Sequence, residues 1–240
     1  MIVALLVALI LISSEIYVIN IGKVSGTSPM SSVEELGLAM ELGSRHVVIG
    51  SLANMTSGGS NESLTANLQR WVSFVEVEQG FRNNILSFSL ENSTPFSGGL
   101  YVSWGTNGLG VSSALVNLSY RIEDQDINWT RRFTVNVATS VQMNCSYQML
   151  NENEKQNFIT IQLTYDCLPT LAKQISLQYD QNGTWLTANK SDNYLMQNCG
   201  NGTYIAWFST SSQDANSILV QATDENGIVV QASTISQPNS

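Results

Sequence analysis

The feature that most constrains this chain is an abrupt change of character at Lys23. The first 22 residues, Met1–Gly22, are almost entirely apolar and carry a single charge, Glu15. A helix of 22 residues spans roughly 33 Å, about the thickness of a bilayer's hydrocarbon core. We therefore expect residues 1–28 to form an apolar transmembrane or filament-core helix, outside the body formed by the rest of the chain.

The remainder is polar, acidic and poor in charge. Charged residues make up 12% of the chain, about half the usual share, and apolar residues make up 43%, enough for a packed core. The net charge of −9 argues against a nucleic-acid partner, because phosphate binding needs a basic face. It also argues against docking on an anionic membrane through basic patches.

Nine Asn-x-Ser/Thr sequons follow the apolar segment, about twice as many as the serine and threonine content gives by chance. Selection for N-glycosylation would place them on an exported, solvent-facing surface. The alternative is that an asparagine- and threonine-rich chain simply contains sequons. The predicted glycosylation sites are Asn54, Asn61, Asn92, Asn117, Asn128, Asn144, Asn182, Asn189 and Asn201.

Two helices are expected after the break at Lys23–Pro29. Ser32 and Glu35 have the spacing of a capping box, and apolar residues recur at helical intervals to Met55, which predicts a helix over 32–55. After the linker Thr56–Ser60, an apolar stripe predicts a second helix over 62–79. We assign residues 29–84 to a unit of helical stalk and packing helices.

From Ile85 the apolar period changes to two, which is typical of strands. Residues 85–132 are predicted to form a β-rich head subdomain. Residues 133–240 carry seven short alternating segments and Gly-terminated turns at Asp180–Gly183 and Asp224–Gly227, which favour an immunoglobulin-like β-sandwich. The predicted fold class is therefore α+β: an N-terminal apolar helix and further helices, then a β-rich region ending in that sandwich.

Three cysteines, Cys145, Cys167 and Cys199, lie in the last hundred residues. If the strand before Cys167 pairs with the strand after Cys199, these two cysteines meet at one end of the sandwich. The hypothesis is a Cys167–Cys199 disulfide with Cys145 free, and the alternative is three reduced thiols. No Cys/His spacing of a zinc site is present.

No catalytic constellation emerges. His46 is the single histidine, and we interpret it as a packing or interfacial residue. Gly110–Ala114 lacks the final glycine of a nucleophile elbow, and Gly105–Gly110 leads into a strand, as in a hairpin, whereas a phosphate loop leads into a helix. The acidic turn Glu123–Asn128 does not match a calcium loop. We predict a protein that is not an enzyme and has no cofactor and no metal site.

The stretch Ile2–Ile12, IVALLVALILI, before a β-rich, sequon-dense body resembles archaeal type IV pilin-like surface proteins. Arg45–Asn54 and Tyr101–Tyr120 are also similar to such proteins. Leu5 stands where many pilins have a glutamate. The resemblance implies a short basic leader that is removed, and a helix that sits in the membrane before it bundles in a filament core.

The resemblance predicts a structural subunit of an extracellular filament. Its partners would be copies of itself or other pilin-like subunits, the membrane before assembly, and N-linked glycans. The runner-up is a single-pass membrane-anchored surface glycoprotein that does not polymerise, and a secreted enzyme is the third alternative. The residues expected to make helix–helix contacts are Ile2, Leu5, Leu6, Leu9 and Ile12.

Overall fold

The computed structural model describes residues 29–78, 84–124, 127–212 and 217–239. Strands form 58% and helices 22% of this part, and only two of its helices are α-helices. The predicted α+β class, with an N-terminal apolar helix and further helices before a terminal immunoglobulin-like sandwich, is therefore wrong, and the fold is β-rich. No helix among the described residues is long and apolar enough to cross a membrane. The helix expected in residues 1–28 lies outside them.

Both helices predicted in the body of the chain are confirmed. Helix α2 spans Pro29–Thr56 and helix α3 spans Ser63–Glu78. Helix α2 begins three residues before the predicted cap at Ser32, because proline is tolerated in the first turn, where its missing N–H has no helical partner. At the other end, the Thr56 hydroxyl donates back to the Leu52 carbonyl at 2.9 Å.

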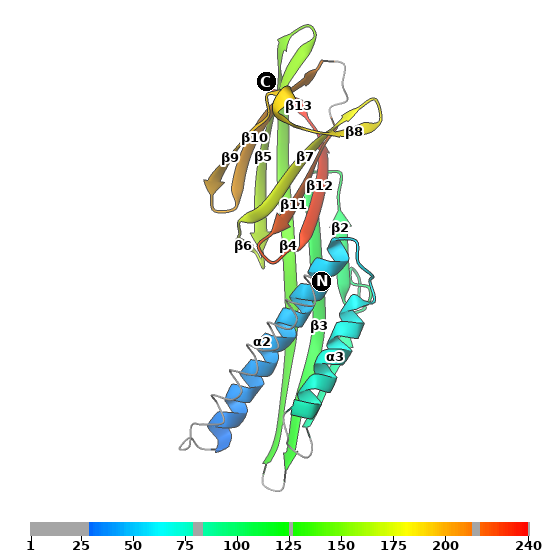
Figure 1. Cartoon of the computed structure of the whole chain (residues 1–240), viewed down its shortest axis with the longest axis vertical. Helices are drawn as coiled ribbons and strands as arrows, with labels where there is room; N and C mark the ends of the chain where they lie inside the picture. The colour runs from blue at the N-terminus through cyan, green and yellow to red at the C-terminus, as the bar shows by residue number, and fades with distance from the viewer. Residues whose placement is uncertain (1–28, 79–83, 125–126, 213–216, 240) are drawn as a thin grey trace.

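Two sheets make up the β structure (Figure 1). The first has nine strands, and its continuous path runs in the order β1, β3, β4, β5, β10, β9. Its strands are β1 Asn84–Leu90, β2 Leu100–Trp104, β3 Leu109–Asp124, β4 Ile127–Asn151, β5 Glu154–Tyr165, β6 Leu168–Pro169, β9 Leu195–Gly200, β10 Thr203–Ser211 and β13 Gln237–Pro238. The second sheet has the order β12 Val229–Ile235, β11 Ser217–Asp224, β7 Ala172–Gln181 and β8 Thr184–Thr187, and a short 3-10 helix, η1, covers Lys190–Asp192.

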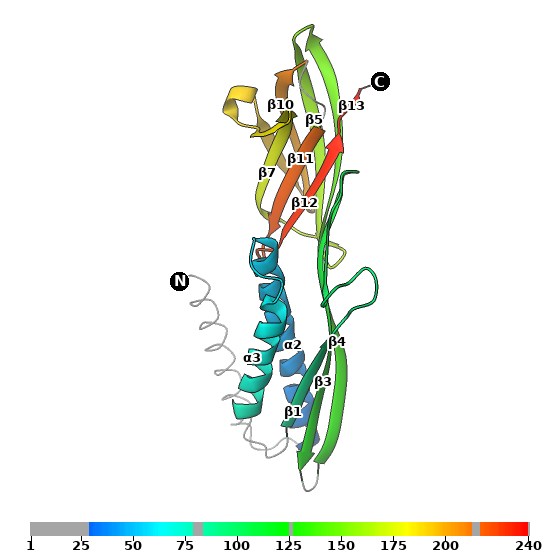
Figure 2. The same cartoon turned by 90° about the vertical axis from the view of Figure 1, so that its right-hand side faces the viewer.

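Strand β4 runs through both halves of the molecule. Its first part pairs with β3, from Ile127 to Gln142, and its last part pairs with β5, from Thr139 to Asn151. Alternate residues of a strand point to the same face. Val135, Val137 and Thr139 are buried on the face that also buries Val141 and Met143, so one face of β4 serves both halves. Figure 2 shows the helices and the second sheet on the same side of the first sheet.

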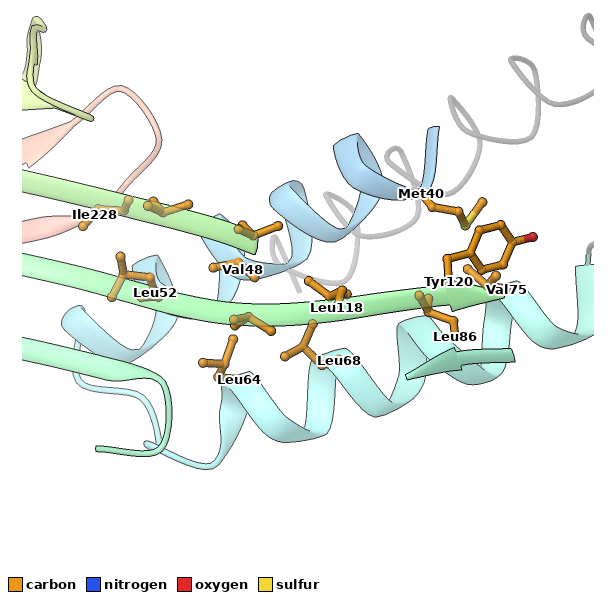
Figure 3. Packing of buried hydrophobic residues seen from close by; sticks show 14 of the residues in the cluster. Met40, Val48, Leu52, Leu64, Leu68, Val75, Leu86, Leu118, Tyr120 and Ile228 are labelled. Atoms are coloured by element: carbon orange, nitrogen blue, oxygen red, sulfur yellow. The ribbon is translucent and has the colours of Figure 1, made fainter. Parts of the chain in front are cut away.

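In the lower half of Figure 1, α2 and α3 cover β1, β3 and the start of β4. Figure 3 shows Val48 and Leu52 of α2 and Leu64 and Leu68 of α3 directed at the strand that carries Leu118. All five are buried and belong to one hydrophobic cluster. Fully burying such a side chain contributes about 1.5–3 kcal/mol, so this cluster holds the helices to the sheet.

Tyr120 is an exception within this cluster. Its side chain is fully buried, and its hydroxyl has no hydrogen-bond partner in the described part of the chain. Burial raises the pKa of Tyr120 to about 12. The ring packs edge-on against Trp129, with centroids 6.0 Å apart, so the contribution of this residue comes from its ring.

In the upper half, the second sheet packs face to face on β4, β5 and β10. The shared core includes Ile161, Phe208 and Val220, and Phe208 packs against Tyr179 at 5.5 Å between ring centroids. The top of this core is polar, since Lys155 and Asn157 are both 2% exposed. Lys155 lies over the Tyr147 ring at 5.5 Å.

A buried hydrogen-bonded seam joins the two halves. Asp224, at the end of β11, is fully buried and accepts a hydrogen bond from the Thr139 hydroxyl at 2.7 Å. Its other carboxylate oxygen accepts from the backbone N–H groups of Asn226 and Ile228, each at 2.9 Å. Removing one partner of a buried charged group leaves it unsatisfied, which costs several kcal/mol.

Next to this seam, the backbone of Val229 in β12 forms hydrogen bonds to a helix and to the first sheet. The Val229 N–H donates to the Thr56 hydroxyl at 3.0 Å, which ties β12 to the end of α2. The Val229 carbonyl accepts from Ser112 of β3 at 2.7 Å. A Cβ placed on Gly110 would lie 2.0 Å from the Gln231 carbonyl oxygen, so β3 and β12 can approach this closely only because residue 110 is glycine.

Arg45 links α2 to the turn after β5. Its guanidinium pairs with Asp166 and donates to the Asn136 carbonyl at 3.2 Å and the Tyr165 hydroxyl at 3.3 Å. Asp166 also accepts from the Ala138 N–H at 2.9 Å, so the pair holds α2, β4 and β5 together. Burial lowers the pKa of Arg45, but Tyr165 and Asp166 outweigh it and the pKa lies above its ordinary value.

Most predicted strands are confirmed, and so are the hairpins at Asp180–Gly183 and Asp224–Gly227. Asn182 and Gly183 both have positive φ, as a two-residue type I′ turn requires. The short strands β6, β9 and β13 were not predicted. The boundary expected between residues 132 and 133 falls inside β4, which continues without a break.

Two glycines of α2 provide a test of the helix packing. A Cβ on Gly43 would lie 2.4 Å from the Trp71 ring, whereas a Cβ on Gly50 would meet nothing within 4 Å. We expect Gly43→Ala to lower the free energy of unfolding by about 1–3 kcal/mol through overpacking. Gly50→Ala should raise it by roughly 0.5–1 kcal/mol through helix propensity. Urea unfolding measures both, and equal shifts of the same sign would contradict the α2–α3 contact.

Candidate functional site

Two hollows of the described surface are shallow and open. One, of about 640 Å³, lies over the outer face of α3 between Ala66 and Val77. The other, of about 570 Å³, lies over β1, β3 and β4 around Asn117 and Arg132. Neither lining contains a histidine, cysteine or carboxylate, so neither offers a general base. Among the described residues no cluster of three or more His, Cys, Asp or Glu side chains could hold a metal ion.

The residues singled out for chemistry in the sequence lie apart. His46 is exposed on α2, and Glu123 at the end of β3 pairs with Arg121. The glycine-rich stretch Gly105–Gly110 is a hairpin connection, as predicted. Its backbone bonds to Ser233 of β12, through the Gly108 N–H at 2.8 Å and the Gly105 carbonyl at 2.9 Å. The loop of the first sheet is therefore bonded to β12, an edge strand of the second sheet.

The predicted glycosylation sites are distributed over the outside of the body. Eight of the nine asparagines are exposed, and Asn117 is half-buried. Several side chains take part in local turns: the Asn92 amide oxygen accepts from Gly98 at 2.7 Å, and the Asn189 amide oxygen accepts from Ser191 at 2.8 Å. The Asn117 amide oxygen accepts from Thr134 at 2.8 Å. Asn144 makes no side-chain hydrogen bond within the described part of the chain.

The predicted Cys167–Cys199 disulfide is not formed, and all three cysteines are free. The reason is the strand order β5, β10, β9, which puts β10 between β5 and the strand that carries Cys199. Cys167 lies in the turn after β5, and Cys199 lies on β9, which pairs with β10 and not with β5. Cys145 packs against the hydrophobic core between the two sheets and is free, as predicted.

The five residues expected to make helix–helix contacts, Ile2, Leu5, Leu6, Leu9 and Ile12, lie outside the described residues. Their role therefore stays a prediction. Comparison with known proteins adds nothing to it: no protein-family model and no curated protein matches this chain.

Sequence reasoning missed two arrangements that only the strand pairing creates. The first is a pair of links between distant elements: Arg45 of α2 pairs with Asp166 in the turn after β5, and Thr139 of β4 bonds to Asp224 of β11. The second is an apolar row on the outer face of the first sheet, which Leu195, Trp207 and Phe158 form across three strands. Period-two alternation placed Trp207 and Phe158 on strands, but it did not show that they are neighbours.

Thiol labelling tests the placement of the cysteines. Burial raises the pKa of Cys145 to about 12, so at pH 8 only about one thiol in ten thousand is ionised. Cys167 and Cys199 are exposed. We expect iodoacetamide to alkylate Cys167 and Cys199 in the folded protein and to leave Cys145 unmodified, as read by peptide mass spectrometry.

The unfolded protein is the control, because all three thiols should then react. Equal labelling of Cys145 in the folded state would contradict its burial. Protection of both Cys167 and Cys199 that a reductant removes would restore the disulfide hypothesis.

Proposed function

We propose that this chain is a structural subunit of an extracellular, type IV pilus-like filament. The apolar segment Met1–Gly22 would hold the subunit in the membrane before assembly and pack against other copies afterwards. The observation that carries the proposal is the join between this nearly uncharged segment and a body on which eight of nine sequons are exposed. An exported protein presents its sequons in this way, on the side of the membrane where sugars are carried.

The position of α2 supports the same proposal. The helix begins at Pro29, at the end of the molecule away from the two-sheet half (Figure 1). Residue 29, to which the apolar segment leads, therefore lies at one end of the body, and the part in which the two sheets pack together lies at the other. A subunit built in this way can be held at one end while its sequon-bearing surfaces remain in solvent.

The body itself supports a structural role. Its helices and second sheet are held on one sheet by two hydrophobic clusters and the seam at Asp224. The two hollows described above are shallow and lack a general base. Assembly would then depend on the apolar segment, which exchanges lipid contacts for close side-chain packing against the same segment of other copies.

Substitution in the apolar segment tests the proposal. We expect Leu6→Glu or Leu9→Glu to abolish filaments or membrane insertion, because a carboxylate at the centre of an apolar span costs about 2.5–3.5 kcal/mol. Leu168→Glu is the matched control, since Leu168 is 70% exposed on β6 and should tolerate the charge. Electron microscopy of material sheared from cells, with N-terminal sequencing of the subunit, gives the readout.

Three outcomes separate the alternatives. Filaments from the wild type and from Leu168→Glu, but not from Leu6→Glu, support a filament subunit. Filaments that persist in the Leu6→Glu or Leu9→Glu variant contradict it. Membrane-bound wild-type protein without any filament favours the anchored glycoprotein.

A further inference from the structure

The outer face of the first sheet is uncharged where it backs the two-sheet core. On β5 and β10 the core receives Ile159, Ile161, Ala206 and Phe208. The residues between them therefore point outward, because side chains alternate along a strand. From Gln142 to Ser146 of β4, from Gln156 to Gln162 of β5 and across the facing parts of β10 and β9, the outward residues are uncharged. They are Gln142, Asn144, Ser146, Gln156, Phe158, Thr160, Gln162, Ile205, Trp207, Leu195 and Gln197.

An apolar row crosses this face. Leu195 of β9 lies opposite Trp207 of β10, and Trp207 lies opposite Phe158 of β5. Leu195 is 58% exposed, Ile205 beside the row is 38% exposed, and the two aromatic rings are half-buried. Two aromatic side chains that lie opposite each other on an uncharged part of the sheet offer a stacking surface to a ligand without charge.

The row leads directly to a sequon. Phe158 lies opposite Ser146, the hydroxyl residue of the sequon that begins at Asn144. Asn144 itself is exposed, points outward and lies opposite Thr160. Asn144 and Phe158 are diagonal neighbours on adjacent strands, a separation of about 7–8 Å that long side chains bridge. Trp207 lies on β10, the strand next to β5, and neighbouring strands are about 4.8 Å apart.

We propose that the N-linked glycan on Asn144 folds back over this face and packs its first sugar rings on Phe158 and Trp207. The ligand class is a neutral sugar, attached covalently to the chain. The inference rests on the proposed function, which requires an exported and glycosylated body, and it adds what one of those glycans does.

The chemistry of both partners suits this contact. One face of a pyranose ring presents C–H groups with partial positive charge, and an aromatic ring presents a negative face. The hydroxyl groups at the edge of the sugar can bond to Gln197 and Thr160, which lie next to the row on the side of Asn144. Covalent attachment gives the sugar a high effective concentration at the row, so a modest stacking energy is enough to order it.

A cycle of variants in a glycosylating and a non-glycosylating host tests the proposal. For the full glycosylated chain in detergent, we expect Asn144→Gln to lower Tm by about 2–4 °C, as measured by calorimetry. Asn61→Gln is the matched control, because Asn61 is an exposed sequon in the linker between the helices and lies away from the row. In protein from the non-glycosylating host, Asn144→Gln should leave Tm unchanged.

Phe158→Leu and Trp207→Leu complete the cycle, because leucine keeps the apolar bulk but removes the aromatic face. When Asn144→Gln is added to the Phe158→Leu variant or to the Trp207→Leu variant, both made in the glycosylating host, Tm should change much less than when it is added to the wild type. The comparison stays valid if the leucine variants are less stable, since only the glycan-dependent difference is read. Peptide mass spectrometry establishes which asparagines carry sugar.

The outcomes are distinct from those for the filament. A glycan found on Asn144 whose loss does not change Tm, or a bare Asn144 among occupied sequons, overturns this inference and leaves the proposed function intact. The Phe158→Leu variant could instead lose filaments while Tm shows no dependence on the glycan. The apolar row would then be a contact with a second copy of the chain, and this result also overturns the inference. If no asparagine carries sugar, the inference is overturned, and so is the part of the proposed function that requires a glycosylated surface.

Discussion

The structure depends on one strand, β4, whose buried face is continuous over both halves of the molecule. The helices pack on this face at Val135 and Val137, and the second sheet packs on it at Val141 and Met143. Between them stands Thr139, which is fully buried and donates to the carboxylate of Asp224. A buried carboxylate is stable only when its oxygens are hydrogen-bonded. The helices and the second sheet must therefore pack on β4 in the one arrangement that places Asp224 at Thr139.

This arrangement explains how a chain with 12% charged residues forms a stable body. Two of the three described ion pairs join α2 to the β structure: Arg45 with Asp166, and Glu41 with Arg131 at 2.6 Å. Each partner is partly exposed, so the pairs position the helices more than they stabilise the fold. The outer faces are left to hydroxyl and amide side chains, which suits a surface that carries sugars or neighbours rather than one that binds charged ligands.

Much of the local structure could be predicted from the sequence. The apolar stripes of α2 and α3, the alternation from Ile85 onward and the Asn182–Gly183 turn depend on neighbours within a few residues, and the structure agrees with them. The predicted fold class was wrong because it gave weight to a helix in residues 1–28 and to a separate C-terminal sandwich. Strand β4 instead runs through the predicted boundary at residue 133 and makes one sheet of both β regions.

The strand pairing behind the disulfide hypothesis is confirmed, since β5 pairs with β10. The disulfide itself is not formed, because Cys199 lies on β9, an unpredicted strand on the far side of β10. By itself, the sequence determined where the chain is apolar, where its helices and turns form, and which asparagines can carry sugar, since these follow from residue type and short spacings. Only the tertiary structure decided which distant residues meet: Arg45 with Asp166, Thr139 with Asp224, and Asn144 beside Phe158. Strand order and register follow from the packing of the whole sheet, which no local pattern encodes.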